Sequence, residues 1–250
     1  MAILKTIFYE PLYNALVFLV SVIPGHDVGV AIILLTVLVR AILFPLGQKS
    51  AKSQIELRMI EPEIAKIKEE FKNNKEEQAK KTFELYRKHG VNPFSGCLLT
   101  LIQLPIIIAL YYVFLKGIGS GALLDGGTLY SFITPPDFIN TNFLGLIDIT
   151  KKSLILALLA GLTQFIQAYL TVIPSSGAEK KSFKGDLMKS MQFQMKYFLP
   201  IFVFFIAYKI SAGVALYWTI SNIFMIAQEM VVRRKLAKKH EHIGVKILNP

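Results

Sequence analysis

Arg40 is the residue whose position most needs a chemical explanation, because it lies inside the apolar run 28–46. At about 1.5 Å of rise per residue, a helix of that length nearly crosses a hydrocarbon core of about 30 Å. An arginine at such depth costs roughly 2.5–3.5 kcal/mol, so it needs compensation. Its side chain can snorkel to the surface near Gly47, about 10 Å along the helix, or it can bind polar groups on other helices.

Polar residues in the other apolar runs are candidate partners for Arg40. Each could alone be a hydrogen bond between packed helices. Together with an arginine at membrane depth, they predict a wet, positively charged groove inside a helix bundle. The candidate groove residues are Arg40, Thr36, Gln103, Gln164, Gln167, Trp218, Ser221 and Asn222.

Five apolar runs are long enough to position these side chains, although the fourth, 197–210, is short for a membrane span. The sequence therefore predicts an all-α polytopic membrane protein. The expected spans are 28–47, 95–116, 153–174, 195–210 and 213–232. The expected segments between and beside them are an interfacial amphipathic helix at 1–27, a charged helical hairpin at 48–92, an extracytoplasmic loop at 117–152, a cytoplasmic loop at 175–194 and a basic tail at 233–250.

Within the hairpin, Asn73 and Asn74 indicate a turn between two helices, and Pro62 suits the first turn of the first helix. Apolar residues at helical spacing predict one apolar stripe on each helix. These stripes are Ile64, Ile67 and Phe71 on the first helix, and Ala79, Phe83 and Tyr86 on the second.

Loop charges predict the orientation. Lysine and arginine number 11 between Gly47 and Ser95, 5 between Pro174 and Lys196, and 6 from Arg233 onward, whereas the remaining segments outside the spans hold few. Short basic loops stay in the cytoplasm. The N-terminus is therefore expected outside, with the hairpin and the C-terminal tail in the cytoplasm.

Several function classes lack the residues they need. Glu229 is the only acidic residue in the apolar runs, so the sequence offers no central carboxylate for proton or sodium coupling. None of the four histidines lies in those runs, which leaves an intramembrane serine protease without a base. There is no Walker motif, and the single cysteine, Cys97, gives no disulfide framework. The expectation is a protein that is not an enzyme and has no cofactor or metal.

Short motifs along the chain resemble the YidC family of membrane protein insertases and their mitochondrial and chloroplast relatives. Those motifs are the arginine before Phe44-Pro45, Gly90-Val91-Asn92-Pro93, Gly96-Cys97-Leu98, Gln103-Leu104-Pro105-Ile106, Ala109-Leu110-Tyr111, Pro200, Gly213, Leu216-Tyr217-Trp218 and Ser221-Asn222. The resemblance implies five spans around a hydrophilic groove that is open to the cytoplasm and to lipid. It also implies that Arg40 is the groove arginine and that Gln164 and Trp218 line the groove.

The resemblance further implies a chain that inserts newly made membrane proteins into the bilayer without ATP hydrolysis. Its expected partners are nascent membrane proteins and lipid, with the ribosome, a signal-recognition receptor and the Sec translocon as further candidates, and no specific nucleic-acid recognition. A bacterial plasma membrane is the expected location. A small-anion transporter or channel and a non-inserting assembly chaperone remain as alternatives. One departure from the family pattern is Ser211-Ala212-Gly213, where Pro-Ser-Gly is usual.

Overall fold

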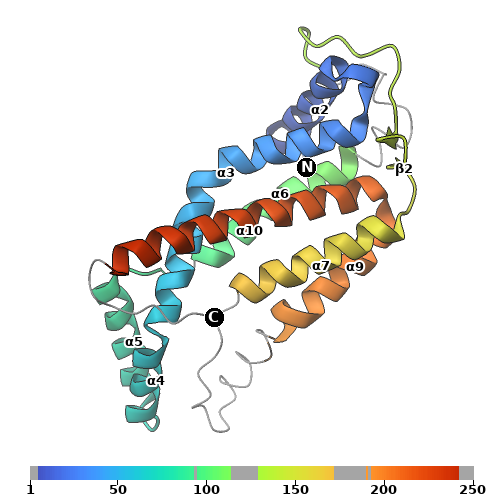
Figure 1. Ribbon diagram of the computed structural model, residues 1–250. Coiled ribbons are helices and arrows are strands. Elements are labelled where there is room, and N and C mark those ends of the chain that lie inside the picture. The colour runs from blue at the N-terminus through green and yellow to red at the C-terminus, as the bar shows by residue number, and fades with distance from the viewer. Residues whose placement is uncertain (1–4, 93–94, 114–128, 172–189, 191–192, 242–250) are drawn as a thin grey trace.

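A bundle of helices running side by side forms the body of the molecule, as a computed structural model shows (Figure 1). The structure describes residues 5–92, 95–113, 129–171, 190 and 193–241. The long helices of the bundle are α3 (Val28–Met59), α6 (Ser95–Tyr112), α7 (Leu154–Thr171), α9 (Leu199–Ile210) and α10 (Ala212–Glu241). The hairpin of α4 (Glu61–Glu70) and α5 (Lys75–His89) projects from one end, and α2 (Glu10–Val22) lies at the other.

Helix α10 is the centre of the bundle. It packs against both α3 and α7, while α6 packs on α3 and α9 packs on α7. Ala157, Ala160, Ala207 and Ala215 are fully buried where these helices meet. Small side chains let helix backbones approach closely, which is how helices associate in lipid, where apolar burial gives no driving force.

Three helices in the described part of the chain are long and apolar enough to cross a membrane, namely α3, α7 and α10 up to Leu236. Helix α6 contributes a shorter apolar stretch, Leu101–Tyr112, to the described part of the chain. Helix α9 has 12 residues and continues a single π-helical turn, Gln194–Phe198. The chain is thus a multi-pass membrane protein, while the second and fourth predicted spans stay predictions.

Helix α3 begins at a well-defined cap and extends beyond its predicted span. Asp27 accepts a hydrogen bond from the backbone N–H of Val30 at 3.1 Å, which satisfies a free donor of the first turn. The helix then accommodates Pro45 and runs without interruption to Met59. The hairpin proper therefore comprises only α4 and α5, and the point at which α3 leaves the membrane remains a prediction.

A loop and a small hairpin close the end of the bundle near α2. Strands β1 (Asn142–Phe143) and β2 (Ile147–Asp148) pair antiparallel across a turn in which Leu144 and Gly145 both have positive φ. Asp27 also accepts from the N–H of Leu144 at 2.8 Å, which ties this turn to the start of α3. The carbonyl of Lys151 accepts from the N–H of Ala212, so the same loop holds the start of α10.

The N-terminal segment packs into the main hydrophobic core, in addition to its expected location in the membrane interface. A π-helical turn, Lys5–Tyr9, leads into α2, and a 3₁₀ turn, Pro24–His26, joins α2 to α3 with Gly25 at a φ of 77°. Leu16, Val17 and Val20 of α2 are fully buried in the main core. The location of the opposite face of α2 in the membrane interface stays a prediction.

Helices α4 and α5 lie against each other as a helical hairpin. Pro62 lies in the first turn of α4, and Asn74 caps α5 by accepting from the N–H of Glu77. Leu85 is the buried residue of α5, and Tyr86 packs beside it, whereas Ala79 and Phe83 are exposed. The spacing of three apolar residues places them on one side of a helix, but it does not determine which side meets α4, and on α5 that side is the one with Leu85.

Candidate functional site

Arg40 points into the bundle rather than toward the membrane surface. It lies about 18 Å along α3 from Val28, near the middle of a typical hydrocarbon core. Only 6% of its surface is exposed. Its Nε donates to the hydroxyl of Ser221 at 2.8 Å, and its Nη2 donates to the same oxygen. The snorkelling alternative is thereby excluded for this conformation.

The electrostatic environment of Arg40 is unusual because its partner is neutral. Among the residues that the structure describes, the ion pairs do not include Arg40. A guanidinium has five N–H donors, and a single hydroxyl cannot satisfy them all. The site can therefore attract an anionic group that approaches it.

Helix α10 directs polar side chains toward three different neighbours. Ser221 meets Arg40 on α3, Tyr217 accepts a hydrogen bond from the amide of Gln103 on α6, and Asn222 donates to Thr163 on α7 at 3.3 Å. Tyr217 and Ser221 are four residues apart and therefore share a face. We name Arg40, Gln103, Thr163, Tyr217, Ser221 and Asn222 the polar cluster.

Asn222 has an unused acceptor inside this cluster. Its side chain is fully buried, and its Oδ1 has no hydrogen-bond partner in the part of the chain that the structure describes. A buried polar atom without a partner costs roughly 1–3 kcal/mol. Water or a backbone N–H from a bound peptide would satisfy it.

Polar groups continue from the cluster toward the C-terminal end of α7. Gln164, 7% exposed, donates to the amide oxygen of Gln167 at 3.3 Å. Gln167 in turn donates to the hydroxyl of Thr171 at 2.9 Å, in the last turn of the helix. These residues form a polar line along α7 that begins beside Thr163.

Two arginines meet at the end of this line, and sequence reasoning did not identify them. Arg58 of α3 and Arg233 of α10 both donate to the carbonyl of Leu170, the second at 2.6 Å. Arg233 also pairs with Glu229 at 3.1 Å. The Leu170 carbonyl lies in the last turn of α7, and position 174, its usual helical donor, is a proline. The spacing of Glu229 and Arg233 was the only sequence signal for this group.

Helices α3 and α10 approach each other closely between the polar cluster and the two arginines at the Leu170 carbonyl. Gln228 donates to the carbonyl of Phe44 at 2.7 Å. A side chain at Gly47 would place its Cβ 2.7 Å from the Oε1 of Gln228. Glycine at position 47 therefore lets the amide reach the backbone of α3.

Two predicted groove residues lie outside both the polar cluster and the polar line along α7. Thr36 is buried on α3, but its hydroxyl donates to the carbonyl of Ile32 in its own helix at 2.6 Å. Trp218 is half-buried and packs against the hydrophobic core. Of the six other candidates, the polar cluster contains Arg40, Gln103, Ser221 and Asn222, and the polar line along α7 contains Gln164 and Gln167. The role of each of the eight candidates in a groove stays a prediction.

Together, the apolar helices and the polar cluster define a polytopic helical membrane protein with a buried cationic site. Residues 18–239 match the family described as 60Kd inner membrane protein, so the chain belongs to that family.

Three bacterial relatives, each named membrane protein insertase YidC, align with most of the chain. The protein of Pelobacter propionicus is 34% identical over 232 residues, which are 92% of this chain and 39% of the relative. That of Clostridium tetani is 32% identical over 227 residues, 89% of this chain and 90% of the relative. That of Alcanivorax borkumensis is 33% identical, and the aligned part is 91% of this chain but only 36% of the relative.

Proposed function

We propose that this chain is a membrane protein insertase that moves short polar tails of newly made membrane proteins into and across the bilayer. One observation carries the proposal: a cationic side chain of a helix long and apolar enough to span the membrane is buried against a neutral hydroxyl. An acidic residue in an incoming tail would supply the anionic partner. The names of the bacterial relatives support the same function.

The proposed path is a groove between α3, α7 and α10 that leads from the cytoplasm to Arg40. The polar line from Thr163 through Gln167 to Thr171 supports this direction, because it ends where Arg58 and Arg233 meet. The distribution of lysine and arginine supports a cytoplasmic location for that end and an outside location for the N-terminus. In this arrangement α6 and the segment 195–210 complete five spans.

The groove accelerates insertion by shortening the dry part of the path. A polar tail loses the hydration of its backbone and charges when it enters hydrocarbon. Opposite charges 4 Å apart attract by about 4 kcal/mol at an effective dielectric constant of 20, so Arg40 would offset part of that loss. Transfer of the client's apolar segment into lipid is favourable, which makes ATP hydrolysis unnecessary.

Each candidate residue has a role in this proposal. Arg40 attracts the tail, Ser221 holds the guanidinium until a client arrives, and Asn222 offers its free acceptor to a backbone N–H. Thr36, Gln103, Gln164, Gln167 and Trp218 line the wet path. Clients and lipid are the proposed partners, and the ribosome, a signal-recognition receptor and the Sec translocon are candidates for delivery at the cytoplasmic side.

The test is insertion of a single-span client into vesicles that contain only this protein, scored by protection of the translocated tail from protease. Two clients are compared, one with aspartates in a short N-terminal tail and one with asparagines in their place. The variants are Arg40→Ala and Arg40→Lys, with Arg234→Ala as a control that removes an exposed cation of α10. We expect Arg40→Ala to lower insertion of the acidic tail at least tenfold, Arg40→Lys to retain most of it, and Arg234→Ala to change little.

Three results would contradict the proposal. An equal loss of insertion for the acidic and the neutral tail would mean that Arg40 is needed for the stability of the protein and not for attracting the tail. Equal insertion by the Arg40→Ala variant would remove its electrostatic role. An absence of insertion by the unaltered chain in intact vesicles would favour a chaperone that assists folding without inserting.

A further inference from the structure

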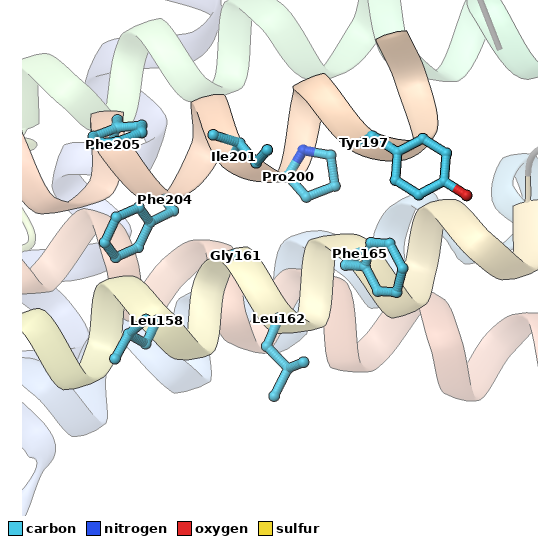
Figure 2. Close-up of a pocket in the computed structure, with 9 residues that line it drawn as sticks. All are labelled: Leu158, Gly161, Leu162, Phe165, Tyr197, Pro200, Ile201, Phe204 and Phe205. Carbon is cyan, nitrogen blue, oxygen red and sulfur yellow. The ribbon is translucent and has the colours of Figure 1, made fainter. Parts of the chain in front are cut away.

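An apolar depression lies between α7 and α9, on the side of α7 that faces away from the polar cluster. Its volume is about 530 Å³. Figure 2 shows side chains of both helices lining the space, with Phe165 and Tyr197 at one end and Phe205 at the other. Leu158, Leu162 and Phe165 follow one face of α7 and are exposed, whereas Thr163 and Gln164 are buried. The insertion path proposed above does not use this surface.

Gly161 sets the distance between the two helices. A Cβ there would lie 3.0 Å from the Cβ of Phe204 and 3.4 Å from the carbonyl oxygen of Pro200. Neither atom is the mobile end of a long side chain, so the backbones are in close contact at this level. The larger side chains on either side of this contact form the walls of the depression.

One end of the depression carries a positive charge. The Nζ of Lys196 lies 4.4 Å from the ring centre of Tyr169 and 5.6 Å from that of Tyr197. Tyr197 lines the depression itself. Among the described residues, the ion pairs do not include Lys196. Lysine and tyrosine are typical of the level of lipid headgroups, and cations there attract anionic lipids.

We propose that the depression binds an acyl chain of an anionic phospholipid whose phosphate lies at Lys196. The apolar walls match the chain, and the cation between two tyrosines matches the headgroup. A volume of about 530 Å³ lies in the range of small-ligand sites, about 300–1,000 Å³. A client helix about 30 Å long and 10 Å wide occupies on the order of 2,000 Å³ and does not fit. This site requires only that α7 and α9 face lipid, so it does not depend on insertase activity.

The test uses tryptophan quenching by phospholipids with brominated acyl chains. Trp218, the single tryptophan, is replaced by phenylalanine, and Phe165→Trp places a reporter in the depression. Leu38→Trp, on an exposed face of α3, is the reference reporter. Brominated phosphatidylglycerol and phosphatidylcholine are compared at equal mole fraction. A single lysine near the headgroup should favour the anionic lipid about fivefold at position 165, with less than a twofold preference at position 38.

Lys196→Gln should abolish the preference at position 165, whereas Lys209→Gln, at the opposite end of α9, should leave it unchanged. Equal preference at both reporters, or a preference that survives Lys196→Gln, would overturn the site. Native mass spectrometry of the chain without reporters gives an independent reading, in which Lys196→Gln but not Lys209→Gln should lose retained phosphatidylglycerol. Crosslinking of a client span to position 165, with no lipid quenching, would assign the depression to clients instead.

Discussion

The guanidinium of Arg40 and the hydroxyl of Ser221 are joined by a buried hydrogen bond, although the two residues lie 181 positions apart in the chain. This bond connects the first long helix to the last. It also holds a charge at membrane depth without neutralising it. A site built in this way holds the guanidinium in place and leaves N–H donors for the anionic group that we propose it binds.

Removal of the Ser221 hydroxyl should destabilise the protein. Ser221→Ala leaves a buried guanidinium without its hydrogen-bond acceptor, and a hydrogen bond to a charged group is worth about 1.5–3 kcal/mol. We expect a loss of that size in the free energy of unfolding, measured by denaturant titration in detergent. The control is Thr219→Val, because the hydroxyl of Thr219 is buried two residues away but donates only to the carbonyl of Ala215 in its own helix. Equal losses in the two variants would contradict a special role for the Arg40–Ser221 bond.

The sign of the Gly47→Ala effect should depend on residue 228. In the native chain the new Cβ would displace the buried amide of Gln228 from the Phe44 carbonyl, at a cost of about 1–3 kcal/mol that exceeds alanine's gain in helix propensity. In a Gln228→Ala background the clash is absent, and alanine favours the helix over glycine by about 0.5–1 kcal/mol. Unfolding of the four members of this cycle tests the reversal. If Gly47→Ala lowered the free energy of unfolding equally in both backgrounds, the contact with Gln228 would not be the cause of the loss.

Arg58 and Arg233 should prove non-additive, because they share one acceptor. Replacing either by methionine leaves the other bonded to the Leu170 carbonyl, but replacing both leaves that carbonyl without either arginine. We expect the double variant to lose about 0.5–3 kcal/mol more than the sum of the single losses, measured by unfolding in detergent. Arg234→Met, an exposed change next to Arg233, should show no coupling with Arg58→Met. Strict additivity of the Arg58 and Arg233 losses would argue against the shared acceptor.

Asp148 should make the loop before α7 sensitive to acid. Partial burial raises the pKa of its carboxyl, but hydrogen bonds from Thr150 and Lys151 outweigh this effect and leave the pKa below the usual value. A depressed pKa in the folded state means that the ionised form stabilises the fold above the unfolded pKa of about 4, and that this contribution disappears as the pH falls through the folded value.

We therefore expect the unaltered chain to lose more stability between pH 5 and pH 2.5 than the Asp148→Asn variant, by less than about 1 kcal/mol because the group is partly exposed. Thermal unfolding at the two pH values measures the difference. Asp137→Asn, an exposed carboxylate of the same loop, should behave like the unaltered chain. A pH dependence that is unchanged by Asp148→Asn would refute the assignment.

The sequence by itself determined that this is a helical membrane protein and that Arg40 needs a partner. Apolar runs of spanning length predicted α3, α7 and α10, and Asn74 and Pro62 predicted the ends of the hairpin helices. It also supplied Ser221, Asn222 and Gln103 as candidates, because polar groups at membrane depth face protein or water. The resemblance to insertases rested on motifs along the chain that include these three residues, and the family assignment is confirmed.

Only the tertiary structure decided which polar groups meet. It selected Ser221 for Arg40, joined Gln103 to Tyr217, and left Trp218 against the core. It also brought Arg58 and Arg233 to one carbonyl of α7, and it buried Leu85 of α5 and left Phe83 exposed. Helical spacing fixes which residues share a face of one helix, but the rotation of that helix against its neighbours fixes which face is used. That rotation follows from the packing of all the helices together.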